Sequence, residues 1–109
     1  MYIYNITVNI DESVQQQWLN WVTNTHIPNM LNSGKFTKAK LSQVLVNEEM
    51  GGVTYSIQFT ATNIEALHLY YKEDADKFNK ESTQRFKDKF VMFSTELKVI
   101  FEQFQNNNN

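Results

Sequence analysis

The sequence predicts an α+β fold in which four strands and two helices follow one another in the order β-α-β-β-α-β. Strict alternation of apolar and polar residues predicts strands from Tyr2 to Ile10 and from Val53 to Thr62, because successive side chains of a strand point to opposite faces. Apolar residues at helical spacing, preceded by residues that suit helix N-caps, predict a helix after each of these strands.

The first strand has apolar residues at every even position from Tyr2 to Ile10, and Asn or Thr at most odd positions. This pattern is typical of a strand with one buried face. Asp11 and Ser13 then offer N-caps for the first helix. Trp18 and Trp21 follow at helical spacing, so we expect this helix to pack an aromatic face on the sheet.

The segment from Trp21 to Phe36 gathers residue types that are scarce elsewhere, including the only proline and one of the two histidines. Pro28 disfavours helical geometry at Ile27, so we expect the helix to end or kink there. Gly34 suits a left-handed cap after a short second turn.

The second half of the chain predicts two more strands and one more helix. We expect a less regular strand from Phe36 to Val46 and a hairpin turn from Asn47 to Gly52 before the strand that begins at Val53. Thr62 and Glu65 form a capping box that opens the second helix. Its expected apolar stripe consists of Ile64, Leu67, Tyr71, Ala75 and Phe78.

The charged stretch from Lys72 to Lys89 predicts the solvated part of this helix and its exit. A fourth strand is expected from Phe90 to Phe101. The chain should therefore form a single domain over residues 1–103, and the Asn-rich residues 104–109 should be a disordered tail.

The β-α-β-β-α-β order is that of a ferredoxin-like domain, a four-stranded antiparallel sheet with two helices on one face. The other face of such a sheet is open to water or to a partner. We expect it to be a polar dimer face that carries Asn5, Thr7, Thr54, Ser56, Gln58 and Thr60.

The composition excludes several classes of function. The 109-residue chain has no cysteine, which excludes disulfides, thiol nucleophiles and thiolate metal sites. Its three glycines are too few for a glycine-rich phosphate loop, and its net charge of −2 argues against nucleic acid as a partner. No secretory signal or membrane-spanning run is present, so we expect a cytoplasmic protein.

The RNA-recognition motif has the same order of elements and is a specific alternative. That motif needs aromatic side chains on the open face of the third strand. Here this face would carry Thr54, Ser56, Gln58 and Thr60, on which bases cannot stack.

The motif W-x4-H-I-P-x2-L-x2-G-x-F, from Trp21 to Phe36, resembles the first helix and exit turn of dimeric α/β-barrel proteins. Nearly the whole chain is similar to a bacterial family known as domain of unknown function 4286. The supporting stretches are Y-N-I-T-V-N-I at 4–10, G-G-V-T-Y-S-I-Q-F at 51–59 and F-S-T-E-L at 93–97. The resemblance implies the ferredoxin-like fold and a homodimer, in which two sheets form a barrel, and it carries no established activity.

His26 is the candidate for chemistry, because an imidazole at the broken end of a helix can act as acid or base near neutral pH. A structural alternative is that it caps the helix carbonyls. Tyr4, Trp21, Tyr55 and Tyr71 could line a ligand pocket, although the same spacing suits an ordinary core. His26 and His68 lack a carboxylate at ligand spacing, so no metal is expected. The sequence also lacks a nucleotide or flavin signature, so no other cofactor is expected.

Two functions follow from this pattern. The protein could be a homodimeric small-molecule-binding or accessory protein. Alternatively, it could be a cofactor-independent enzyme, of the monooxygenase or isomerase kind, that uses His26 as acid or base. Whether His26 opens into a cavity or is sealed against backbone carbonyls distinguishes the two hypotheses.

Overall fold

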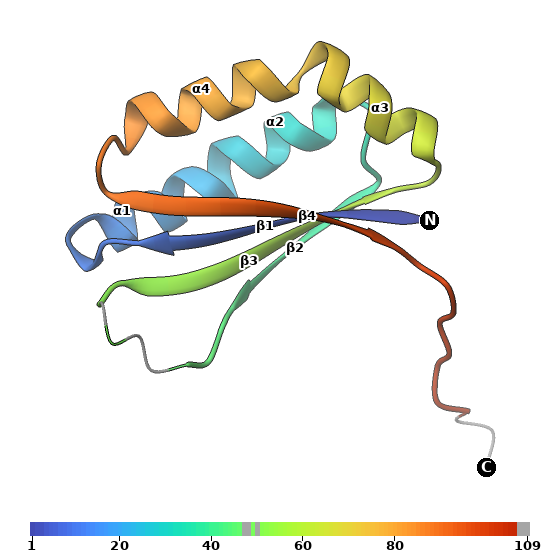
Figure 1. Cartoon of the computed structure of the whole chain (residues 1–109), viewed down its shortest axis with the longest axis horizontal. Helices are drawn as coiled ribbons and strands as arrows, with labels where there is room; N and C mark the ends of the chain where they lie inside the picture. Colours follow the sequence, from blue (N-terminus) through green and yellow to red (C-terminus); the bar gives the residue numbers. More distant parts are fainter. Residues whose placement is uncertain (47–48, 50, 107–109) are drawn as a thin grey trace.

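A computed structural model describes residues 1–46, 49 and 51–106 (Figure 1). It contains a four-stranded antiparallel sheet in the order β2-β3-β1-β4, with all the helices packed on one face. The strands are β1 (Tyr2–Ile10), β2 (Lys38–Gln43), β3 (Val53–Ala61) and β4 (Phe90–Lys98). This arrangement confirms the predicted ferredoxin-like α+β fold.

The two strands with strict alternation lie side by side in the middle of the sheet. In their register Tyr4 faces Phe59, Ile6 faces Ile57 and Val8 faces Tyr55. All six side chains are buried against the helices. Burial of one face of each central strand explains why the alternation was so regular in the sequence.

The fourth strand ends earlier than expected because its antiparallel partner β1 begins only at Tyr2. Lys98 pairs with Tyr2 at the beginning of β1, and the Val99 N–H then donates a last hydrogen bond to the Met1 carbonyl at 3.0 Å. Residues 99–106 continue without regular secondary structure. The second strand is also shorter than the expected range, and Phe36 before it is buried in the core.

The sequence predicted that the first helix ends or kinks at Pro28. The structure shows that the helical stretch does not end there. A short 3-10 turn, η1 (Glu12–Val14), leads into α1 (Gln15–Trp21), a π-helical turn η2 (Val22–His26) and α2 (Ile27–Asn32). The Ile27 N–H bonds to the Val22 carbonyl, five residues earlier. Pro28 has no N–H and its ring crowds the preceding turn, so the wider π turn accommodates it within the helix.

The second helical stretch consists of α3 (Ile64–Glu73) and α4 (Ala75–Arg85), which meet at Asp74. Its N-cap is Asn63, whose side chain accepts a hydrogen bond from the Ala66 N–H at 2.9 Å, and not the expected Thr62. Tyr70 is buried and Tyr71 is half-exposed. The expected apolar stripe therefore contained the wrong one of two adjacent tyrosines.

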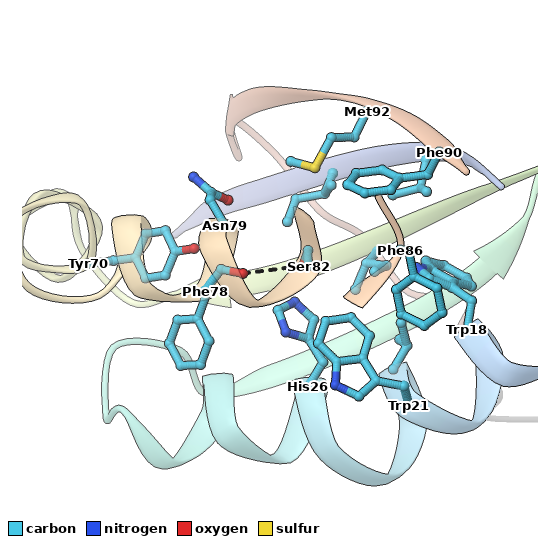
Figure 2. A pocket seen from close by; sticks show the side chains of 14 residues that line it. Trp18, Trp21, His26, Tyr70, Phe78, Asn79, Ser82, Phe86, Phe90 and Met92 are labelled. Atoms are coloured by element: carbon cyan, nitrogen blue, oxygen red, sulfur yellow. Dashed lines mark hydrogen bonds between the residues drawn. The ribbon is translucent and has the colours of Figure 1, made fainter. Parts of the chain in front are cut away.

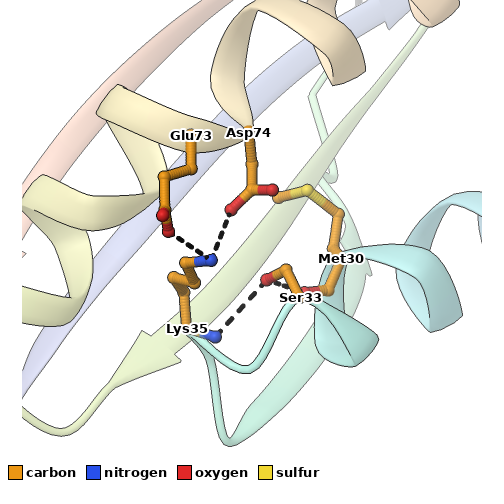
Figure 3. A network of polar contacts seen from close by, with 5 residues as sticks. All are labelled: Met30, Ser33, Lys35, Glu73 and Asp74. Carbon is orange, nitrogen blue, oxygen red and sulfur yellow. Dashed lines mark hydrogen bonds and ion pairs between the residues drawn. The ribbon is translucent and has the colours of Figure 1, made fainter.

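A polar network joins the end of α2 to the junction of α3 and α4 (Figure 3). The Lys35 Nζ lies 2.8 Å from a Glu73 carboxylate oxygen and 3.1 Å from an Asp74 oxygen. The Ser33 hydroxyl donates to the Met30 carbonyl at 2.6 Å and accepts from the Lys35 N–H at 3.4 Å. The network therefore fixes the two helical stretches relative to each other above the sheet.

Parts of two sequence expectations lie outside the described residues. In the hairpin turn, residues 47, 48 and 50 are not described, whereas Gly51 and Gly52 have φ angles of 84° and 79°. Residues 107–109 of the expected tail also lie outside. Within the described part of the chain, no helix is both long enough and apolar enough to cross a membrane.

Candidate functional site

A small cavity lies between the first helical stretch, α4 and the β4 side of the sheet (Figure 2). Its volume is about 20 Å³. A single water needs about 10–15 Å³, so the cavity as it stands has room for one water-sized molecule. The residues around it are Ile6, Val8, Trp18, Trp21, Val22, His26, Ile57, Tyr70, Phe78, Asn79, Ser82, Phe86, Phe90 and Met92.

The π turn brings His26 and Trp21 together at the wall of this cavity. The indole of Trp21 and the imidazole of His26 stack with ring centroids 4.7 Å apart. The His26 ring also makes edge contacts with Phe59 and Phe78, at 6.4 and 5.8 Å between centroids. Sheet, first helical stretch and α4 thus all hold this imidazole in place. Wider π turns are frequent at functional sites.

The His26 side chain is buried and incompletely hydrogen-bonded. The residue is 6% exposed, and its Nδ1 is buried without a hydrogen-bond partner among the residues that the structure describes. Burial lowers the pKa of His26 to about 4, so the imidazole is neutral at pH 7. His26 is the N-cap of α2, and among the described residues its side chain makes no capping hydrogen bond there. A buried polar nitrogen without a partner costs free energy, which a ligand or a water could recover.

Three other polar side chains interrupt the apolar wall. The hydroxyl of Tyr70 points toward the cavity, and Asn79 and Ser82 approach it from α4 (Figure 2). The Ser82 hydroxyl donates to the Phe78 carbonyl at 3.2 Å. Burial raises the pKa of Tyr70 well above its usual range, with a smaller contribution from the hydrogen-bonded Tyr4 side chain, so the Tyr70 hydroxyl stays protonated. The site therefore offers several uncharged hydrogen-bonding groups within an apolar enclosure.

Of the four aromatic residues expected to line a pocket, the structure places only Trp21 at this cavity. Tyr4 is buried beside Tyr70, with ring centroids 5.1 Å apart. Tyr55 packs on Trp18 and its hydroxyl accepts a hydrogen bond from Gln15 at 2.7 Å. Tyr71 is 42% exposed. The cavity therefore brings together His26 and Trp21 but not the other three.

Sequence reasoning missed the contribution of α4 to the site. Residues 72–89 were expected to be solvated because they are highly charged, yet Asn79, Ser82 and Phe86 line the cavity. Phe78, Ser82 and Phe86 are spaced four residues apart and therefore share one helix face. This spacing was the available signal, but the surrounding lysines and acids obscured it.

The open face of the sheet carries the six residues that were expected there. In the strand registers Asn5 pairs with Gln58, Thr7 with Ser56, and Ile3 with Thr60. Thr60 is buried, and the other five are half-buried. The Ser56 hydroxyl donates to the Asn5 side-chain oxygen at 2.6 Å, and the Asn5 amide donates to the Thr7 hydroxyl at 3.1 Å. Polar groups in the centre of this face thus partner one another.

His26 and His68 lie on different elements, and His68 is exposed on α3. Over residues 1–46, 49 and 51–106, the structure contains no group of at least three histidine, aspartate or glutamate side chains that could hold a metal ion.

Solved structures with the same fold come from unrelated sources. A dimeric ferredoxin-like protein from an uncultured marine organism is 15% identical, with a TM-score of 0.70, and the match covers 96% of this chain and all of that one. A candidate antibiotic biosynthesis monooxygenase from Deinococcus radiodurans is 11% identical, with a TM-score of 0.64 over 96% of this chain and all of that one. Hydroxynitrile lyase from Passiflora edulis is 18% identical, with a TM-score of 0.58 over 93% and 97% of the two chains.

At such low identities the similarity establishes only the fold. The last two of these proteins share that fold but are described as different kinds of enzyme, so the fold does not indicate a reaction. None of the curated proteins matches the chain significantly. A family model does match residues 1–100, which is most of the sequence. The chain therefore belongs to the family described as domain of unknown function DUF4286.

Proposed function

We propose that this protein is a homodimer that binds a small, uncharged, largely apolar molecule in the cavity beside His26. The observation that carries the proposal is His26 at the wall of the cavity, with a buried Nδ1 that has no hydrogen-bond partner among the described residues. Such an atom is costly unless something binds to it. A ligand with one hydroxyl or carbonyl group would satisfy it.

The charge and shape of the site narrow the class of ligand. His26 is neutral at pH 7, and the other polar groups at the cavity are a phenol, an amide and a hydroxyl. None of these would compensate a buried carboxylate or ammonium group. The present cavity holds about one water, so a larger ligand must displace side chains. Met92 is suited to this because its unbranched side chain adapts easily.

The homodimer is proposed from the open sheet face. In the described part of the chain no helix covers this face (Figure 1), and a sheet with one uncovered face is available for pairing. The similar marine protein is dimeric according to its description.

An enzyme without a cofactor is the second candidate. The observation in its favour is again His26, since a strongly shifted pKa in a cavity is typical of functional groups. The imidazole is neutral at pH 7 and so is free to accept a proton, although a pKa of about 4 makes it a weak base; its protonated form, which a general acid needs, is scarcely populated at this pH. Trp21 and Tyr70, the latter in place of the expected Tyr71, would shape the substrate pocket.

The proposal can be tested by nuclear magnetic resonance with histidine-labelled protein. The chain has two histidines, so each ring gives a separate signal. Phenol, benzene and benzoate serve as probes that differ in one polar group. We expect phenol to shift the His26 signals and not those of His68, and benzoate to shift neither.

The variant His26→Phe keeps an aromatic ring but removes the nitrogen. It should weaken phenol binding about three- to tenfold, the effect of one lost hydrogen bond, and leave benzene binding unchanged. His68→Gln is the matched control and should bind both probes like the unaltered protein. Equal affinity of His26→Phe for phenol would contradict a role of Nδ1 in binding.

A further inference from the structure

The outer side of β4 carries a strip of apolar side chains on the open face of the sheet. Val91 pairs with Asn9, Phe93 with Thr7 and Leu97 with Ile3, so all three lie on the face away from the helices. Their exposed fractions are 70% for Val91, 63% for Phe93 and 41% for Leu97. We call these three residues the β4 strip.

A second apolar surface follows directly in the chain. Beyond β4, residues 99–106 leave the sheet on the side opposite the helices (Figure 1). Val99 and Glu102 line a hollow of about 100 Å³ together with open-face residues such as Gln58 and Thr60. Ile100, Phe101 and Phe104 are 82%, 78% and 81% exposed, respectively. We call residues 99–106 the C-terminal arm.

The arm does not cover the β4 strip of its own chain, because both surfaces are exposed at the same time. Monomeric proteins rarely expose contiguous apolar surface of this extent, and such surface marks an interaction site. The polar centre of the same face does not need a partner, since Ser56, Asn5 and Thr7 bond to one another. Burial of apolar side chains in the strip and the arm would therefore be the main contribution of this face to association with a partner.

We propose that in the homodimer the C-terminal arm of each chain packs on the β4 strip of the other. This inference rests on the proposed homodimer and adds which residues hold it together. Two-fold symmetry requires that if the arm of one chain meets the strip of the second, the second arm meets the first strip. Each chain has both of the surfaces that such an exchange requires, the β4 strip and the C-terminal arm, on the same side of the sheet.

The available area is consistent with a second copy as occupant. A phenylalanine side chain buries about 150–250 Å², so Phe93, Phe101 and Phe104 at their present exposure offer roughly 350–550 Å² per chain. Two chains would then contribute on the order of 700–1,100 Å² before the rest of the sheet face is counted. Stable interfaces bury about 1,200–2,000 Å² in total, so arms and sheet faces together reach this size.

Cross-linking tests the exchange directly, because the natural chain has no cysteine. One sample carries Gln105→Cys in the arm, and a second, isotopically labelled sample carries Thr95→Cys on the open side of β4. After mixing and oxidation, we expect a disulfide-linked pair of one labelled and one unlabelled chain. The control replaces Thr95→Cys with Leu69→Cys, on exposed α3, and should give no such pair.

The double variant Phe101→Ser with Phe104→Ser gives a second measurement. Both side chains are exposed in the single chain, so its fold should be unaffected, while the dimer dissociation constant should rise at least tenfold. Leu69→Ser, which changes an exposed residue of α3 outside the proposed contact, is the control and should leave the constant unchanged.

The outcomes separate the arm from the dimer itself. A dimer that forms no mixed disulfide and is unaffected by the phenylalanine changes would overturn the arm exchange and leave the homodimer standing. A monomer at all concentrations would overturn both. A mixed disulfide combined with a weakened double variant supports the exchange.

Discussion

At the scale of single residues, the environment of His26 determines its charge and its possible chemistry. The imidazole lies among Trp21, Phe59 and Phe78, whose rings offer no compensating charge. Desolvation therefore favours the neutral form and lowers the pKa to about 4. The sequence showed that His26 was unusual in its position but could not give its burial, which depends on packing against β3 and α4.

This pKa shift predicts acid sensitivity. Between the unfolded value of 6.5 and the folded value of about 4, the unfolded chain binds a proton that the folded chain does not. The free energy of unfolding should consequently be fully retained above pH 6.5 and decrease as the pH falls to about 4, by up to about 3 kcal/mol. Urea unfolding at a series of pH values measures this slope.

The variant His26→Phe removes the titrating group while keeping a ring of similar shape. We expect its free energy of unfolding to vary less between pH 6.5 and 4, whereas His68→Gln should behave like the unaltered protein. If His26→Phe and the unaltered protein show the same slope, another group is responsible for the pH dependence.

At the scale of elements, the regular strands were predictable and the helical details were not. The alternation of β1 and β3 reflects burial of one face, and this signal is present in the sequence itself. Tyr70 and Tyr71 are identical and adjacent, so only the position of the helix on the sheet could decide which is buried. The ends of β4 depend on where β1 begins, and this too is a property of the assembled sheet.

The candidate site was only partly predictable for a similar reason. Trp21 and His26 were identified because they are scarce residues near Pro28, and the structure brings them together at one cavity. Asn79 and Ser82 lie in a highly charged helix, where short polar side chains carry no distinguishing signal. The π turn is a response to Pro28 that the sequence rules treat as a helix end or kink, so its exact form was not foreseen.

The exit of α2 offers a test at this scale. Gly34 was expected to adopt a left-handed conformation, and its φ angle of 82° confirms this. Apart from the two chain neighbours, no atom of the described residues would lie within 4 Å of an added Cβ, so the cost of substitution comes from the backbone conformation. Gly34→Val should lower the free energy of unfolding by about 1–2 kcal/mol, because β-branched residues are strained in this conformation.

The matched variant is Gly34→Asn, since asparagine tolerates the left-handed region. It should be destabilised less than Gly34→Val, as judged from the urea midpoint. Equal midpoints for the two variants would mean that the loop relaxes to another conformation and that Gly34 is not required for the turn.

At the scale of the whole molecule, the fold divides the protein into two working surfaces. The helical face of the sheet holds the cavity with His26, and the open face holds the β4 strip and the C-terminal arm. β4 contributes to both, because Met92 faces the cavity while its neighbours Val91 and Phe93 face outward. Pairing at the open face would thus fix the strand that forms one wall of the proposed binding site.

The open face predicts how a single charge would affect assembly. Phe93 lies opposite Thr7 on this face and is 63% exposed, so Phe93→Lys should change the stability of the single chain by less than about 0.5 kcal/mol. In a dimer the ammonium group would be taken out of water without a partner, which is strongly unfavourable. Light scattering at micromolar concentration should give a dimer mass for the unaltered protein and a monomer mass for Phe93→Lys. Leu69→Lys, which changes an exposed leucine on α3, should remain dimeric. A monomer mass for the unaltered protein would contradict the homodimer, because then no second copy covers the open face.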